Sequence, residues 1–76
     1  MAHSTLEQIS VGTMVKIDRI DDEQMAMMAI RLGIATGEII QVASKVPAGP
    51  MVIRRGRVDI ALGRELCKSI YVSPLS

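Results

Sequence analysis

Residues 28–42 read MAIRLGIATGEIIQV, and this stretch decides the fold. Apolar residues recur at helical spacing up to Gly33, a three-residue link leads to Gly37, and strand-like alternation then begins. Gly33 is placed to end the helix, because the left-handed conformation that closes many helices is easy only without a β-carbon. The stretch therefore predicts a helix that leads through two glycines into a strand, and it carries no sign of catalysis.

Length and composition set the next limits. The 76 residues predict one domain, 1–76, and the 49% of hydrophobic residues include one aromatic side chain, Tyr71, so the core must be aliphatic. A net charge of +1 and the lack of stacking platforms argue against nucleic-acid binding. The single Cys67 excludes an internal disulfide and suits a reducing compartment. Without a signal-peptide pattern or a long apolar run, we expect a cytoplasmic chain that does not itself span a membrane.

The remaining segments predict short strands around one helix. The helix is expected over 22–32, with Asp21 as its N-cap and Gln24 in capping-box spacing. Strands are expected over 14–20, around 40–42, in a hairpin formed by 51–53 and 58–62 with its tip at Arg55-Gly56, and over 69–72. Residues 63–68 predict one helical turn. Five strands with a helix inserted between the first two indicate a mainly β protein that closes into a small barrel, because closure removes exposed sheet edges.

Apolar spacing also predicts which residues are buried. The helix stripe expected to face the core contains Met25, Met28, Ala29 and Leu32. The core as a whole is predicted to contain Val15, Ile17, Leu32, Ile40, Val42, Ile53, Ile60, Leu62, Ile70 and Val72.

Several short motifs together resemble a known family. They are Leu6…Ile9…Gly12, Val15…Ile17, Leu32-Gly33-Ile34 with Gly37, Ile40…Val42, Pro47…Gly49-Pro50, Ala61-Leu62 and Ile70…Val72. In this order, over about residues 6–72, they resemble ferrous iron transport protein A. The same module is similar to the SH3-like C-terminal domain of iron-dependent repressors.

This resemblance implies an SH3-like five-stranded barrel and a cytoplasmic accessory protein. Such a protein would regulate ferrous iron uptake by protein–protein interaction with ferrous iron transport protein B, a membrane GTPase. The alternative is a metal-responsive sensor domain of the repressor kind. Neither interpretation makes the chain an enzyme.

The residues themselves offer no reaction centre. His3 stands near the end of the chain, and Cys67 lies beside Leu66 and Ile70 as a core residue would, so a Cys/His nucleophile pair is not expected. Two patterns leave metal binding open: six methionines, which fit core packing or a soft ion, and an acidic run, which fits a helix cap or a hard-ion site. That run contains Asp18, Asp21, Asp22 and Glu23. We predict no cofactor, no metal site and no catalytic residue.

Two places offer candidate partner-binding residues. Met27 and Ile30 lie on the helix side opposite the predicted core stripe and form a small apolar spot, which is either exposed or covered by a loop. Arg54, Arg55 and Arg57 gather at the hairpin tip, where they fit either a solvated turn or contact with an acidic partner. The helix face would also serve homo-oligomerisation.

Overall fold

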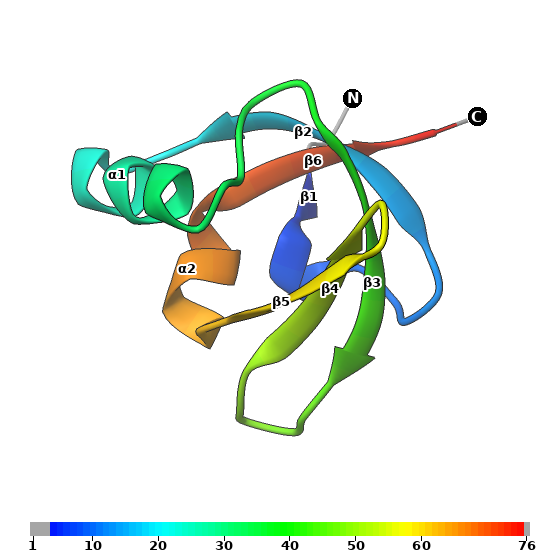
Figure 1. Ribbon diagram of the computed structural model, residues 1–76. Helices are drawn as coiled ribbons and strands as arrows, with labels where there is room; N and C mark the ends of the chain where they lie inside the picture. The colour runs from blue at the N-terminus through cyan, green and yellow to red at the C-terminus, as the bar shows by residue number, and fades with distance from the viewer. Residues whose placement is uncertain (1–3, 76) are drawn as a thin grey trace.

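The computed structural model describes residues 4–75, which form a curved antiparallel sheet with two helices on one side (Figure 1). The strands are β1 Ser4–Thr5, β2 Met14–Ile20, β3 Ile39–Lys45, β4 Met51–Arg55, β5 Val58–Leu62 and β6 Ile70–Pro74. The helices are α1 Glu23–Arg31, α2 Arg64–Ser69 and the 3₁₀ turn η1 Leu6–Gln8. None of the helices in this part of the chain is long and apolar enough to cross a membrane.

The five predicted strands are confirmed, but the described residues form six strands, not five. β1 pairs with β6 over only two residues, Ser4 with Val72 and Thr5 with Tyr71, which is too short for an alternation pattern to reveal. The strand order is β1-β6-β2-β3-β4-β5. Hydrogen bonding therefore makes one open sheet whose edges are β1 and β5. The prediction of a closed five-stranded barrel with one helix is corrected to an open sheet of six strands with two α-helices.

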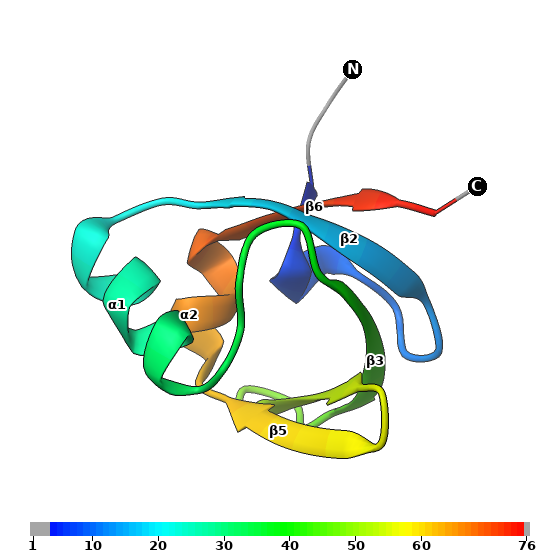
Figure 2. The same ribbon diagram turned by 45° about the horizontal axis from the view of Figure 1, so that its top comes forward.

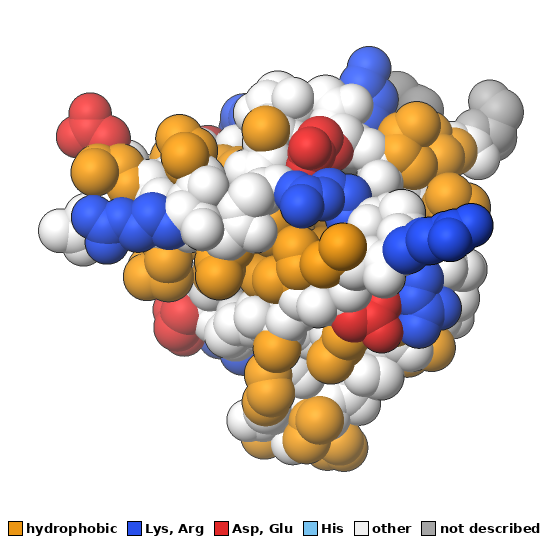
Figure 3. Space-filling model, viewed as in Figure 1, with side chains coloured by type: hydrophobic (Ala, Val, Ile, Leu, Met, Phe, Trp, Pro, Cys, Tyr) orange, Lys and Arg blue, Asp and Glu red, His pale blue; other side chains and the backbone are white. Residues whose placement is uncertain are grey.

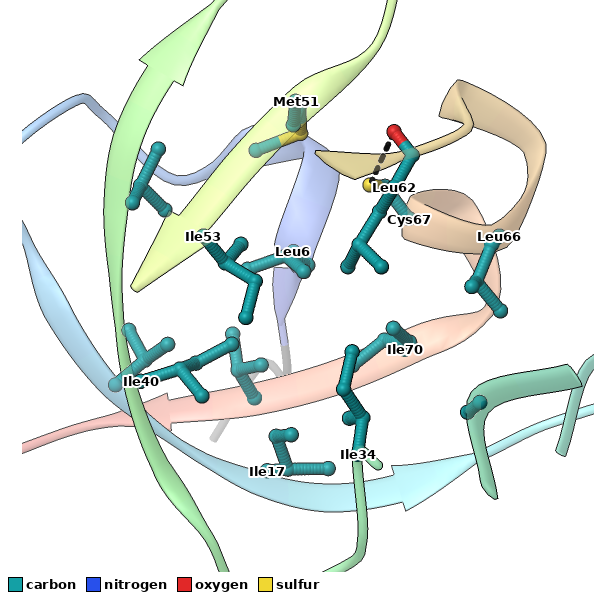
Figure 4. Close-up of a cluster of buried hydrophobic side chains, with 14 residues drawn as sticks. Leu6, Ile17, Ile34, Ile40, Met51, Ile53, Leu62, Leu66, Cys67 and Ile70 are labelled. Carbon is teal, nitrogen blue, oxygen red and sulfur yellow. Dashed lines mark hydrogen bonds between the residues drawn. The ribbon is translucent and has the colours of Figure 1, made fainter. Parts of the chain in front are cut away.

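The interior is filled by apolar side chains from nearly every element (Figure 4). Eight of the ten predicted core residues are fully buried, or nearly so, while Ile60 is partly buried and packs against them. Leu6, Met51, Leu66 and Cys67 complete this core from η1, β4 and α2. Val58, at the start of β5, is 51% exposed although it alternates with Ile60 and Leu62.

Leu32, the tenth predicted core residue, is 37% exposed, so that prediction is wrong. The reason is the way α1 ends. Gly33, at φ +81°, donates to the Ile30 carbonyl at 2.9 Å, and the Ile34 N–H donates to the Ala29 carbonyl at 2.8 Å. This Schellman arrangement turns the chain so that Ile34 packs into the core beside Ala29, and both are fully buried. The helical stripe ends at Ala29, and Ile34 takes the place predicted for Leu32.

The start of α1 also differs by one residue. The N-cap is Asp22, at φ 71°, and its Oδ1 accepts hydrogen bonds from the N–H groups of Gln24 at 2.9 Å and Met25 at 3.3 Å. Asp21 instead accepts from Arg19 Nε at 3.0 Å. The prediction of Asp21 as the cap, which followed its capping-box spacing to Gln24, was wrong because the helix begins one residue later and the carboxylate of Asp22 accepts from its first N–H groups.

Candidate protein-interaction surface

Helix α1 lies at the periphery of the molecule, where it leaves apolar side chains in solvent (Figures 1 and 2). It packs on α2 and β2, with Met25 and Ala29 against the core, and most of its other side chains are exposed among residues 4–75. Met27 and Ile30 are 54% and 69% exposed, as predicted for the side opposite the core. Met28 and Leu32, predicted to be buried, are also exposed. We call Met27, Met28, Ile30 and Leu32 the helix surface.

A shallow hollow of about 270 Å³ lies on α1. It is lined by Gln24, Met27, Met28 and Arg31, so two flexible thioether side chains border one amide and one guanidinium group. Figure 3 shows hydrophobic side chains over α1 with charged groups among them. Apolar anchors with polar groups at their margin are the usual composition of a protein interface, and methionine adapts to the shape of a partner.

The arginines predicted to form one charged cluster have different roles. Arg54 holds Asp59 across the β4–β5 pair with two hydrogen bonds, Nε to Oδ1 at 2.8 Å and Nη2 to Oδ2 at 3.1 Å. Through this bonding the pKa of Arg54 is raised and the pKa of Asp59 is lowered. Arg54 therefore links the two strands of the hairpin, and the carboxylate of Asp59 neutralises much of its charge.

Arg55 reaches in the opposite direction, over the end of α1. Its Nη1 lies 3.7 Å from Glu38 Oε1, and a β-carbon added at Gly33 would come within 2.9 Å of the same nitrogen. This side chain thus links the hairpin to the segment between α1 and β3. Arg57, at the tip, is exposed and makes no ion pair among residues 4–75, so it is the arginine of the three best placed to meet a partner.

Cys67 lies deep in the core with its Sγ 4.0 Å from the Leu62 carbonyl oxygen (Figure 4). Burial raises the pKa of the Cys67 thiol to about 11, which keeps it protonated near neutral pH. A buried, protonated thiol is a poor nucleophile and a poor metal ligand. The other residue of the Cys/His pair, His3, lies outside the described residues.

The acidic residues of the 18–23 segment do not converge. Asp18 accepts from Ser73 Oγ at 3.0 Å, Asp21 pairs with Arg19, and Asp22 caps α1. Within residues 4–75, no three His, Cys, Asp or Glu side chains are grouped so that they could hold a metal ion.

Tyr71, the one aromatic residue, is covered on one face of its ring. The guanidinium carbon of Arg19 lies 4.2 Å from the ring centroid, at a distance typical of a cation–π contact. The ring face turned toward Arg19 is therefore unavailable for stacking on a nucleobase.

Comparison with solved structures defines the class of fold. The fold is similar to that of a manganese-dependent transcriptional repressor at 22% identity and a TM-score of 0.86, with 96% of this chain covered and 42% of the repressor. This chain thus corresponds to less than half of the repressor, and its fold is the SH3-like one of such domains.

Two further structures match along most of both chains. One is described as iron uptake regulatory protein (FeoA), with 24% identity, a TM-score of 0.85, and 99% of this chain and 100% of the other covered. The other is a FeoA-like protein from Clostridium acetobutylicum, with 22% identity, a TM-score of 0.87, and 100% and 91% covered. The comparison with curated proteins found no match.

Residues 4–74 match the model of the FeoA domain, and the chain belongs to this family. The resemblance predicted over about 6–72 is thereby confirmed. The family consists of accessory domains associated with ferrous iron transport and is not a known enzyme family.

Proposed function

We propose that this chain is a cytoplasmic regulatory protein of ferrous iron uptake that acts by binding ferrous iron transport protein B, the membrane GTPase transporter. Membership of the FeoA domain family supports the link to iron transport. The described residues offer no activated nucleophile and no metal cluster, so binding to another protein is the activity that the surface supports best.

The observation that carries the proposal is the helix surface. Met27 and Ile30 expose most of their side chains on a helix whose packing depends on Met25 and Ala29. Isolated exposed apolar residues are ordinary, but three of them on a nine-residue helix and a fourth at its C-cap, beside a hollow, are typical of a binding site. Because the core is complete without them, a partner would cover these residues without disturbing the fold.

The test is a binding measurement with the cytoplasmic GTPase domain of the transporter. Met27→Glu combined with Ile30→Glu should leave the fold intact and abolish binding, because charges placed at the centre of an interface must be desolvated. The matched control is Val11→Glu with Val46→Glu, which adds the same charge at exposed valines outside α1 and should bind normally.

Two results would contradict this account. Normal binding by the folded α1 variant would place the docking surface elsewhere. Loss of folding would show that Met27 and Ile30 stabilise the domain. As a further check, Arg57→Ala should weaken mainly the salt-sensitive part of binding, because an exposed charge at the margin of an interface acts chiefly on the association rate.

A second candidate is a metal-responsive sensor domain. The similarity in fold to the manganese-dependent repressor favours it, since that protein is described as metal-dependent. The dispersed acidic residues argue against a resident ion in this chain. A metal titration, described in the Discussion, separates the two candidates.

A further inference from the structure

The two edges of the sheet differ in length and exposure. β1 is only two residues long, whereas β5 runs for five residues and pairs with β4 along one side. Within residues 4–75 no strand pairs with the other side of β5, which lies along the rim of the molecule (Figure 2). A row of backbone donors and acceptors therefore faces outward from β5.

β5 lacks the usual features that prevent edge pairing. Its sequence, VDIAL, contains no lysine and no proline. Its pairing with β4 is regular at all five positions, whereas β2–β6 and β3–β4 both contain a register shift. Its single charge, on Asp59, is engaged by Arg54. The edge is thus regular, carries Asp59 as its one charged side chain, and is open to a further strand.

The hairpin turn determines which backbone groups face outward. The loop contains two residues, Gly56 and Arg57, and Gly56 has φ +62° as in a type II′ turn. The flanking pair, Arg55 with Val58, is then hydrogen-bonded, and such pairs alternate along the strands. Val58, Ile60 and Leu62 consequently bond to β4, while the N–H and C=O groups of Asp59 and Ala61 point away from it.

We propose that β5 is a homodimerisation edge, to which β5 of a second copy of this chain adds in antiparallel orientation. The two outward-facing positions lie symmetrically about Ile60. A two-fold axis at Ile60 therefore places Asp59 of each copy opposite Ala61 of the other and forms four backbone hydrogen bonds. The strand is self-complementary in this register.

Charge selects this register over the neighbouring one. A shift that places the axis at Asp59 sets two carboxylates directly opposite each other, and like charges in that position destabilise a sheet. With the axis at Ile60, each Asp59 faces a methyl group. On the inner face of the sheet the same register places Ile60 beside Ile60 of the second copy and the half-exposed Val58 beside Leu62. A single strand pair is a small interface, so the dimer should be weak and concentration-dependent.

Sedimentation equilibrium from micromolar to millimolar concentration tests the proposal. The native chain should pass from monomer to dimer. Ala61→Pro removes an N–H that does not bond to β4, and proline is tolerated at such edge positions. This variant should stay folded and raise the dissociation constant about tenfold or more, because two hydrogen bonds are lost per dimer.

A charge pair at the same position tests the register. Ala61→Asp places a carboxylate opposite Asp59 of the second copy and should weaken the dimer, whereas Ala61→Lys places an ammonium group there and should preserve or strengthen it. Ser10→Asp, at an exposed site outside the sheet, adds the same charge as Ala61→Asp and should leave association unchanged.

The proposal is overturned if the native chain is monomeric at every concentration tested. In that case an extended segment of another protein would be the candidate to pair with the β5 edge. It is equally overturned if a dimer forms and the folded Ala61→Asp and Ala61→Lys variants associate alike. Should Ala61→Pro fail to fold, this charge pair decides alone. The measurement needs no iron transporter, so its outcome is independent of the proposed function.

Discussion

Ile34 and Leu32 stand two residues apart and look alike in the sequence, yet only Ile34 is fully buried. The left-handed Gly33 between them reverses the chain and exchanges their environments. At the scale of single residues, burial in this domain is thus decided by backbone turns as much as by apolar character. Cys67 is likewise buried because of its place in the backbone: it lies in the short helix α2, on the side that packs into the core.

Ile34→Ala should therefore cost about 2–5 kcal/mol of unfolding free energy, a large share of the stability of a small domain. Leu32→Ala should cost clearly less, because its side chain already contacts solvent. Urea denaturation of both variants provides the measurement, and each serves as the control for the other. Equal losses would contradict the assignment of Ile34 to the core.

The raised pKa of the buried Cys67 thiol predicts that the domain loses stability at alkaline pH. The thiol's folded pKa of about 11 exceeds the value near 8.5 expected in an unfolded chain, so unfolding releases a proton above that value. The stabilisation is complete below about pH 8.5 and is lost as pH rises through 11, by on the order of 3 kcal/mol. Denaturation across this range should show a steeper decline for the native chain than for Cys67→Ala. Parallel curves for the two proteins would refute this role.

At the scale of elements, α1 is held by its ends. Asp22 satisfies two N–H groups at the start, and the Schellman hydrogen bonds of Gly33 and Ile34 close the other end. Arg55 then lies over that closed end and joins it to the hairpin. These contacts let a short helix stay ordered while most of its surface remains in solvent.

Asp22→Ala should destabilise the domain by about 0.5–2 kcal/mol, because two helix N–H groups lose their acceptor. Asp21→Ala should have a smaller effect, since it removes only a solvent-exposed pair with Arg19. Asp22→Asn, which preserves the acceptor, is the conservative control. Thermal melts of the three variants give the ranking, and a larger loss for Asp21→Ala would restore the cap predicted from capping-box spacing.

At the scale of the whole molecule, two separate surfaces remain open among residues 4–75, the helix surface on α1 and the free edge of β5. The helix surface presents side chains, and the β5 edge presents backbone groups. A chain with both features would be able to bind a partner and a second copy of itself at the same time. Metal binding, by contrast, has no comparable surface among the described residues.

Anaerobic calorimetry with Fe(II) should accordingly give weak, unsaturable heats. Asp18, Asp21 and Asp22 each take part in a hydrogen bond or ion pair, and no three metal-ligating side chains are grouped within residues 4–75. Asp21→Asn with Asp22→Asn is the control, because it removes charge and keeps a capping oxygen. A saturable 1:1 isotherm that this control abolishes would favour the sensor candidate.

The sequence by itself determined the order of the elements and the family. Period-2 alternation, the Gly33–Gly37 spacing and the turn residues are local signals, so five of the six strands in the described residues, α1 and the resemblance over 6–72 were predicted and are confirmed. Met27 and Ile30 were placed on the helix side away from the core for the same reason, because helical periodicity is local, and the structure shows that this side is exposed.

Only the tertiary structure decided which residues meet across the chain. The pairing of β1 with β6, the burial of Ile34, and the carboxylates that engage Arg54 and Arg55 depend on contacts between distant segments or on backbone turns. The openness of β5 has the same origin. A strand pattern specifies which side chains point inward, but whether its outer backbone groups find a partner is settled by the position of every other strand.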